Sequence, residues 1–226
     1  MAVVKNNAIS QVDINIKNAK ELVEAQSHIS ETMVLWMDLL GFRGDIDKEN
    51  WDVNSRKVVF AMERIAAFHE VALTSMDQNH EIVQLNDALV IGRDLGKDPK
   101  TEIEEFLALV DYCFEVSALT DRKIGGKGVR GVIAKGIRYS LRGNLGWLRG
   151  SDLKSPSFFC PRPIMMNTAF GRAYGVESSG YLKKCSALYV DKSLLDYQSR
   201  IMETWNINNI FDVEKFGKFL LVREYN

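Results

Sequence analysis

The sequence predicts an α+β fold, with one antiparallel sheet that carries helices on one face, in the ferredoxin-like order strand, helix, strand, strand, helix, strand. The first observation behind this prediction is the apolar run 33–40, which is typical of a strand buried on both faces. The second is helical periodicity at 55–75 and again from residue 98. The third is the segment 81–92, where two short strands meet at a polar pair, and a further strand begins at Val129.

The two core helices carry local signals of their own. Apolar residues recur at helical spacing over 55–75. The predicted buried face of this helix comprises Val58, Val59, Met62, Ile65, Ala66, His69, Ala72 and Leu73. In the second helix, Pro99 lies in the first turn, and the glutamates after it suit the positive end of a helix. The polar segment 44–52 before the first helix is interpreted as a surface loop.

The second half of the chain is predicted to complete this core and to add to it. The glycine-rich segment 122–128 lacks the G-x-x-x-x-G-K-[ST] pattern of a phosphate-binding loop and is interpreted as a plain connection. Two strands joined by a sharp turn are predicted at 129–137 and 138–147, and a helix is predicted at 164–178. The additional elements are a strand at 186–190, a helix at 193–202 and a strand at 216–223.

Composition restricts the class of protein. A chain of 226 residues is compatible with one domain, so we expect an N-terminal extension over 1–31 and a single domain over 32–226. The net charge of −1 argues against a broad surface for nucleic acid. Three widely spaced cysteines without a C-x-x-C pair indicate reduced thiols and a cytoplasmic location. The sequence has no signal peptide and no long apolar run, so no membrane span is expected.

One carboxylate interrupts the first apolar run. Asp38 lies near the end of the predicted strand and is followed by Gly41 and Phe42. Burying an unpaired carboxylate is costly, so a metal, a cation or a set of backbone N–H groups is expected beside it. Gly41 would let the chain turn tightly and expose N–H groups to an anion. The segment therefore predicts a carboxylate next to a phosphate-sized anion site.

A second carboxylate follows at the joint of the two short strands. Asp87 and Asp38 would lie at strand ends of one sheet, where neighbouring strands are ~4.8 Å apart, so they could share divalent cations. Asn86 and Asp87 also suit a plain hairpin turn. The occurrence of both segments in this order favours the metal site over the plain turn.

The segments "MDLLGF" (37–42) and "LNDALVIG" (85–92) together resemble the class III nucleotidyl cyclases, and most closely the bacterial Pycsar antiphage cyclases. The segment 129–136 resembles the next strand of those enzymes, and 173–177 resembles a later helix. Asn86 departs from the small residue that is usual before the second aspartate. The resemblance extends from about Thr32 to Asp191 and implies the cyclase catalytic fold.

The resemblance also implies a reaction. A nucleoside triphosphate would be converted to a 3′,5′-cyclic mononucleotide and pyrophosphate with the help of two Mg²⁺ or Mn²⁺ ions. The implied metal ligands are Asp38, Asp87 and the carbonyl of Leu39. The implied phosphate ligands are the N–H groups of Gly41, Phe42 and Arg43. Pycsar enzymes further imply a second-messenger role in antiphage defence, and class III cyclases imply a homodimer with composite active sites.

An arginine is needed to stabilise the charge that develops in the transition state. If Asn167 matches the asparagine of the family's catalytic helix, Arg172 is the candidate, although it lies five residues later instead of four. Alignment on Ala173 and Tyr174 instead places glycine at both catalytic positions, so both alignments depart from the purine cyclases. Arg130 competes with it, because guanidinium groups bind phosphate oxygens in pairs. Three further competitors in the same region are Arg138, Arg142 and Arg149.

The base is predicted from two positions that read purines in adenylate cyclases. Val83 holds the first position, and Cys160 holds the second if Asn167 is matched as above. An aliphatic side chain and a thiol cannot supply the charged pair that reads a purine, so a pyrimidine triphosphate is predicted. UTP is favoured over CTP because two carbonyl acceptors suit an arginine-rich pocket, with Trp51 or an arginine such as Arg142 near the base.

Three other functions compete with this prediction. A purine cyclase would share every metal-binding feature. The palm fold of diguanylate cyclases and polymerases uses similar paired carboxylates, but the "GGDEF" signature is missing. A non-catalytic nucleotide-sensing domain is disfavoured because both Asp38 and Asp87 are present.

Overall fold

The structure is a computed structural model that describes residues 14–17, 20, 27–77, 79–141, 165–197, 203–205 and 209–225. The chain divides into two compact units. The first comprises 1–30 and 138–167, and the second comprises 31–137 and 168–226. The second unit contains the core of the sheet and its helices. The predicted boundary between residues 31 and 32 stays a prediction.

The core has the predicted order of elements. These are β1 (Ser27–Leu39), α3 (Arg56–Ser75), β2 (Glu81–Leu85), β3 (Ala88–Asp94), α4 (Pro99–Lys123) and β4 (Val129–Leu141). The strands lie in the order β2-β3-β1-β4, and β1 pairs antiparallel with β3. The sheet then continues through β6 (Ser186–Asp191), β8 (Gly217–Tyr225) and β7 (Asn209–Val213). β6 pairs parallel with β4, so the sheet is mixed and not wholly antiparallel as predicted. The predicted α+β fold with its ferredoxin-like core and extra C-terminal strands is confirmed.

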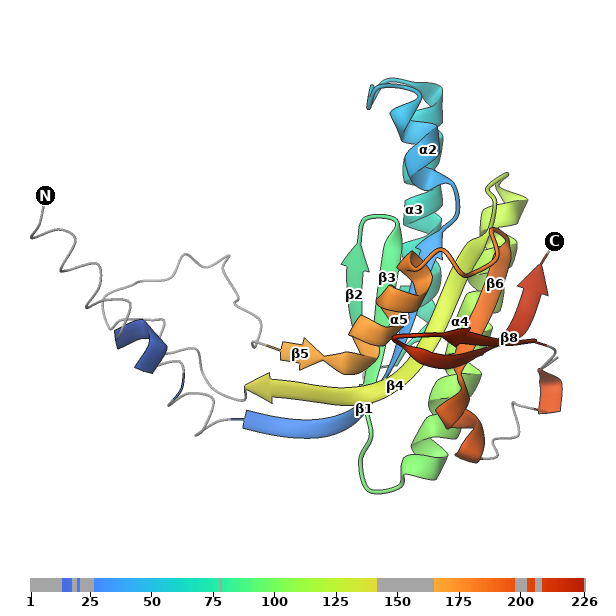
Figure 1. Ribbon diagram of the computed structural model, residues 1–226. Helices are drawn as coiled ribbons and strands as arrows, with labels where there is room; N and C mark the ends of the chain where they lie inside the picture. The colour runs from blue at the N-terminus through green and yellow to red at the C-terminus, as the bar shows by residue number, and fades with distance from the viewer. Residues whose placement is uncertain are drawn as a thin grey trace, which may run out of the picture. The chain divides into compact units, whose positions relative to one another are not determined.

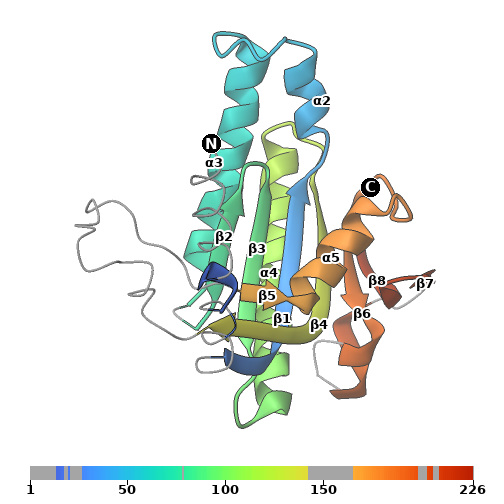
Figure 2. The same cartoon turned by 60° about the vertical axis from the view of Figure 1, so that its left-hand side comes forward.

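Helices cover both faces of this sheet, not one face as predicted, because α5 packs on the side opposite α3 and α4 (Figures 1 and 2). Alternate residues of β1 point to opposite faces, so the strand contributes to two cores. Leu35 and Met37 pack in the core formed with α3 and α4. Val34 and Trp36 pack in the second core, which includes residues of α5 (Thr168–Ser178). The apolar run 33–40 is therefore a strand buried on both faces, as the sequence predicts.

The predicted buried face of α3 is only partly correct. Val58 and Ala72 are buried and Ile65 packs against the core, whereas the predicted positions Val59, Met62, Ala66 and Leu73 are exposed. The other residues of α3 that face the core are Ala61, Arg64 and Phe68. The apolar pattern did not reveal this face because Arg64 occupies it, with only 1% of its surface exposed. A buried arginine requires a partner, and Asp121 of α4 provides it.

Several predictions in the second half of the chain are also corrected. β4 runs from Val129 to Leu141 without the predicted turn after Ile137, because β5 (Met165–Asn167) pairs with its last residues. Gly136 allows a close approach instead of a turn, since a Cβ there would lie 2.5 Å from the Ala169 nitrogen. Because residues 165–167 form β5, the helix predicted at 164–178 begins only at Thr168.

Three short elements differ from the predictions. Part of the predicted loop 44–52 is helical, because α2 (Phe42–Asp47) begins directly after Gly41. The segment Lys192–Tyr197 is a 3₁₀ helix, labelled η2, which overlaps the start of the helix predicted at 193–202. The remainder of that prediction, 198–202, lies outside the described residues. β7 was not predicted, and it pairs with β8.

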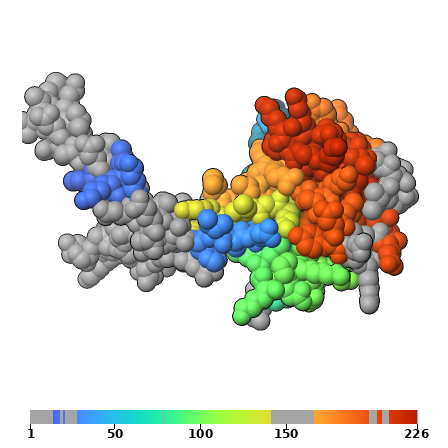
Figure 3. Space-filling model, turned by 60° about the horizontal axis from the view of Figure 1, so that its bottom comes forward, coloured from blue at the N-terminus to red at the C-terminus, as the bar shows by residue number. Residues whose placement is uncertain are grey.

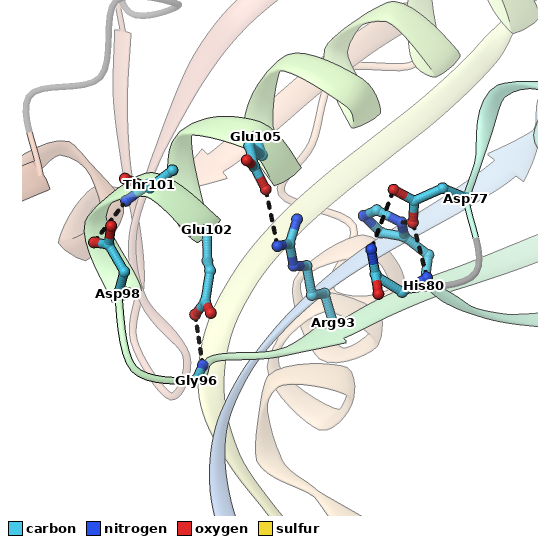
Figure 4. A network of polar contacts seen from close by, with 9 residues as sticks. Asp77, His80, Arg93, Gly96, Asp98, Thr101, Glu102 and Glu105 are labelled. Carbon is cyan, nitrogen blue, oxygen red and sulfur yellow. Dashed lines mark hydrogen bonds and ion pairs between the residues drawn. The ribbon is translucent and has the colours of Figure 1, made fainter.

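The start of α4 is fixed by polar contacts (Figure 4). The N-cap Asp98 accepts a hydrogen bond from the Thr101 N–H at 3.3 Å, and Glu102 accepts one from the Gly96 N–H at 2.5 Å. Arg93 of β3 pairs with Glu105 at 2.9 Å. These contacts confirm the predicted helix start. On the molecular surface, α4 lies in green beside the orange and red C-terminal elements (Figure 3). Within the described residues, no helix is long and apolar enough to cross a membrane.

Candidate active site

The sheet places Asp38 at the end of β1, on the face covered by α5. Val34 and Trp36 point to this face, and the two-residue period of a strand puts Asp38 on it as well. In the ladder between β1 and β3, Asp38 lies opposite Ala88. The carboxylate is half-buried. It therefore stands in a partly desolvated position beside the start of β3.

Asp87 lies next to it at the hairpin that joins β2 to β3. Leu85 pairs with Ala88, which leaves Asn86 and Asp87 as the two turn residues. Asn86 has a φ of 52°, a left-handed conformation that asparagine adopts more readily than most residues. This explains why asparagine precedes the second aspartate here. The Leu39 N–H donates to the Asp87 carbonyl at 3.0 Å, so the predicted neighbourhood of the two aspartate segments is present.

Both carboxylates are harder to ionise than a free aspartate. Burial raises the pKa of Asp38 to about 7, and the charges of Asp87 and Glu177 add to this effect, while Arg130 opposes it. Burial also raises the pKa of Asp87, with a further contribution from Glu177 and an opposing one from Arg64. A carboxylate pair whose ionisation is disfavoured in this way is stabilised when a cation binds.

Arg130 and Glu177 complete the charged set on this face. Arg130 Nη2 donates to Glu177 Oε1, and its Nη1 donates to the Lys183 carbonyl at 3.4 Å. Among the described residues, none accepts a hydrogen bond from the buried Nε–H of Arg130. Sequence reasoning included Arg130 but missed Glu177 as a site residue. The only signal was its place in the segment 173–177, which resembles a helix of the family.

The turn after β1 has the predicted conformation. Gly41 has a φ of 75°, which disfavours any other residue, and α2 starts immediately after it. Phe42 is buried in the core with α3 and α4, whereas Arg43 is exposed and its Nε lies 3.4 Å from Asp47. The Lys127 side chain lies against Gly41, since a Cβ there would be 2.6 Å from its Nζ. Sequence reasoning did not identify this lysine.

Arg172 is held by protein groups. Its Nε and Nη2 donate to the Phe216 carbonyl at 3.1 and 2.9 Å, and Nη1 donates to the Lys135 carbonyl at 2.7 Å. Nη1 also lies 2.5 Å from the buried Asp191 carboxylate. Within this chain the structure therefore does not bring Arg172 to Asp38 in the way it brings Arg130. Asn167 belongs to β5 in the first unit, opposite Arg138.

The residues predicted near the base occupy different places. Val83 pairs with Val90, which pairs with Trp36, so the three lie in one row on the face of the sheet that carries Asp38. Trp51 lies in the turn between α2 and α3, where it is 62% exposed and its Nε1 donates to Asp47 at 3.1 Å. Three other predicted or competing positions, Arg142, Arg149 and Cys160, lie outside the described residues.

The residues present fit a divalent cation. Carboxylate oxygens are the ligands that Mg²⁺ and Mn²⁺ prefer, and the raised pKa of both Asp38 and Asp87 shows that their ionised forms would gain from a nearby positive charge. Within the part of the chain that the structure describes, no group of three acidic, histidine or cysteine side chains forms a complete metal site. The remaining ligands would therefore come from backbone carbonyls, water or a phosphate.

Comparison with known proteins gives a consistent structural result. Neither a family model nor a curated protein matches the sequence. Among solved structures, the adenylyl cyclase CyaB from P. aeruginosa is similar with a TM-score of 0.55 and 12% identity, covering 88% of this chain and 96% of that one. The guanylate cyclase domain of RhGC from Catenaria anguillulae, in complex with GTP, is similar with a TM-score of 0.52 and 14% identity, covering 89% and 100%.

A third similar structure is described as a non-canonical dimeric guanylyl cyclase domain, from the RhoGC fusion protein of the fungus Blastocladiella emersonii. Its TM-score is 0.52 at 16% identity, over 89% of this chain and 99% of that chain. At such identities the likeness concerns the fold. The chain has the fold of the catalytic domains of class III adenylyl and guanylyl cyclases.

Proposed function

We propose that this protein is a nucleotidyl cyclase that converts a pyrimidine nucleoside triphosphate to a 3′,5′-cyclic mononucleotide and pyrophosphate. The observation that carries the proposal is the juxtaposition of Asp38, Asp87 and Arg130 on one face of a cyclase-type sheet. Two carboxylates for cations beside a guanidinium for phosphate are the groups that a triphosphate substrate requires. Fold likeness supports the proposal by analogy.

In the proposed site, one set of residues would bind the cations and another would position the phosphates. Asp38 and Asp87, with the Leu39 carbonyl, would hold two Mg²⁺ or Mn²⁺ ions, which when bound activate the ribose hydroxyl and neutralise the triphosphate. The N–H groups of Gly41, Phe42 and Arg43 would hold the outer phosphates, because the left-handed Gly41 turns this backbone away from the strand.

In the covalent step, the 3′ oxygen forms a bond to the α-phosphorus. The bond from that phosphorus to the bridging oxygen breaks, pyrophosphate leaves, and the hydroxyl proton passes to solvent. Arg130 would bind phosphate oxygens as charge develops on them, in competition with its present partner Glu177. Arg172 remains a proposed transition-state residue only in a partner's site, because its donors are engaged within its own chain.

A pyrimidine base is proposed because the purine-reading position is aliphatic. Val83 lies in a row with Val90 and Trp36, none of which supplies a charged group to a base. A site built to hydrogen-bond its substrate rejects analogues by about 10⁴-fold, so the loss of the charged reader removes purine preference. The resemblance to Pycsar enzymes supports UTP or CTP, and with it a signalling role in antiphage defence.

A homodimer with composite sites is part of the proposal. The support is the resemblance to class III cyclases and the dimeric state of one similar structure. Phe170 and Tyr174 of α5 stack on each other and pack edge-on against Trp36, and the Tyr174 ring, which is 47% exposed, is a suitable contact surface. Sedimentation at assay concentration is expected to show a dimer. A fully active monomer would refute this part.

The test of the activity is a direct assay. Purified protein is incubated with Mn²⁺ and each of the four ribonucleoside triphosphates, and products are identified by mass spectrometry. Cyclic UMP or cyclic CMP with stoichiometric pyrophosphate is the expected result. Preferential formation of cyclic AMP or cyclic GMP would replace the pyrimidine assignment by a purine cyclase. Binding of nucleotide without release of pyrophosphate would leave a nucleotide-sensing domain.

A further inference from the structure

The glycine-rich segment between α4 and β4 is organised around one buried carboxylate. Asp121 lies near the end of α4 with 3% of its surface exposed. Its Oδ2 accepts the Gly128 N–H at 2.7 Å, and its backbone carbonyl accepts the Gly126 N–H at 2.8 Å. A Cβ at Gly126 would collide with the Asp121 carboxylate. The segment 122–128, predicted to be a plain connection, is therefore folded tightly over this aspartate.

The partner of this carboxylate is the buried arginine of α3. Arg64 donates from Nε and Nη2 to the two Asp121 oxygens, at 2.8 and 3.1 Å, which is a bidentate pair. The same Nη2 donates to the Leu40 carbonyl at 3.0 Å. Its Nη1 lies 3.8 Å from Asp45 of α2. One guanidinium thus contacts α4, α2 and the turn that follows β1.

These contacts close a ring around the end of β1. The Leu40 N–H donates to the Gly128 carbonyl at 3.0 Å, and the Gly128 N–H returns to Asp121. Arg64 joins Asp121 back to the Leu40 carbonyl. One residue earlier, the Leu39 N–H donates to the Asp87 carbonyl. The peptide groups that precede Gly41 are therefore held by donors and acceptors on both sides.

We propose that Arg64 and Asp121 are positioning residues of the active site, which fix the Leu39–Gly41 turn against the Asp87 hairpin. Neither side chain is a candidate metal ligand or phosphate ligand. Their effect is exerted through the backbone that carries the proposed ligands. Mutation of residues that orient metal ligands without touching the metal commonly lowers metal affinity or activity by about 10–100-fold. The part of the test that measures cyclase kcat and KM rests on the proposed function.

The chain contains a matched control for this pair. Asp111, also on α4, accepts two bonds from Arg223 of β8, both at 2.6 Å, and a third from Trp205 Nε1 at 3.1 Å. Like Asp121, it combines a bidentate arginine with one further N–H donor. No contact joins the Asp111 pair to the turn after β1 in the described part of the chain.

The experiment compares Arg64→Met/Asp121→Leu with Arg223→Met/Asp111→Leu. Replacing both partners leaves no unpaired buried charge, so each double variant is expected to fold. Arg64→Lys is the third variant, because lysine keeps the charge but lacks the fork that reaches Asp121 and Leu40 together. Each protein is titrated with Mn²⁺ alone by electron paramagnetic resonance, its thermal midpoint is measured, and cyclase kcat and KM are determined.

The Arg64/Asp121 double variant is expected to bind Mn²⁺ at least about 10-fold more weakly and to lose about 10–100-fold in kcat/KM. Arg64→Lys should bind Mn²⁺ several-fold more weakly, while the Arg223/Asp111 variant binds it like the parent. Parent-like Mn²⁺ binding in both Arg64 variants would overturn the inference, and so would equal losses in the control. If the parent binds Mn²⁺ but forms no cyclic nucleotide, the proposed function fails while the Mn²⁺ comparison still decides this inference.

Discussion

Arg130 of β4 and Glu177 of α5 form an ion pair on the face of the sheet that carries Asp38. Glu177 raises the pKa of Asp38 and of Asp87, and Arg130 lowers that of Asp38. Asp87, Glu177 and Arg130 are therefore all close enough to Asp38 to influence its ionisation, and carboxylates outnumber the guanidinium in this set. Such a set attracts cations more strongly than anions, so an anionic triphosphate would bind best after cations have entered it.

The first prediction concerns the two aspartates. Asp38→Ala and Asp87→Ala should each lower the rate of cyclisation by more than about 100-fold. Mutation of a residue that only supports a metal ligand already lowers activity by about 10–100-fold, and these two are the proposed ligands themselves. The fold should persist, because each substitution removes a charge that burial disfavours. Product formation and circular dichroism are measured together. Near-normal activity in either variant would contradict the assignment of both residues to one metal site.

The second prediction is a pH dependence of stability in the presence of a chelator. The folded-state pKa of Asp38 is about 7 against an ordinary value of 3.8, so between these values the folded state holds a proton that the unfolded state has released. Stability therefore falls as the pH rises through this window. Asp38→Asn should gain free energy of unfolding relative to the parent from about pH 4 to about pH 7 and keep that gain above it. Urea unfolding checks this, and a difference independent of pH would contradict it.

The third prediction tests the competition between Glu177 and phosphate for Arg130. In Glu177→Gln the side chain can still accept a hydrogen bond but no longer neutralises the guanidinium. Inorganic triphosphate should then bind up to about 10-fold more tightly, whereas Arg130→Ala should weaken it by about 10–100-fold, the value of a charge-assisted bond. Calorimetric titration measures both. Glu105→Gln, which breaks a pair with Arg93 at the start of α4, is the control and should bind triphosphate like the parent.

The parts of the fold visible in the sequence are those with a local cause. β1 was predictable because a long apolar run needs two covered faces, and Asp38 was conspicuous because it is the one charged residue in the run 33–40. The left-handed turn at Gly41 and the hairpin at Asn86 follow from residue types that tolerate positive φ.

The parts that escaped prediction depend on partners distant in sequence. Arg64 can face the core because Asp121, 57 positions later in the sequence, pairs with it. Since an arginine is charged, the apolar pattern of the sequence did not include this position in the buried face of α3. Glu177 became a site residue because α5 packs over β1 and β4, which no periodicity shows. β4 continued past the predicted turn because β5 supplied a strand partner.

The fourth prediction separates the turn after β1 from the helix that follows. Gly41→Ala requires φ near 75°, which costs an L-residue about 1–2 kcal/mol, and its Cβ would push Lys127 aside. We expect a loss of triphosphate affinity together with lower stability. Gly44→Ala is the control, because nothing lies within 4 Å of its Cβ and alanine favours the α2 helix by about 0.5–1 kcal/mol. Equal triphosphate binding by the two variants would contradict a phosphate role for this turn.

The fifth prediction concerns Arg172. Its guanidinium satisfies the carbonyls of Phe216 and Lys135 and pairs with the buried Asp191. Arg172→Ala leaves these acceptors short of a donor, which should lower the free energy of unfolding by about 1–3 kcal/mol. Arg172→Lys keeps the charge but reaches fewer acceptors, so its free energy of unfolding should lie between that of the parent and that of Arg172→Ala.

Urea unfolding and kinetics on the folded fraction distinguish this structural role from a transition-state role. If Arg172 serves only the packing of α5 against β6 and β8, the lysine variant should retain kcat in proportion to its folded fraction. A fall in kcat far beyond the folded fraction, with KM unchanged, is the signature of a group that acts in the transition state. Mixing Arg172→Ala with Asp38→Ala subunits then locates that action: recovered activity requires a site that takes the arginine from one protomer and the aspartate from its partner.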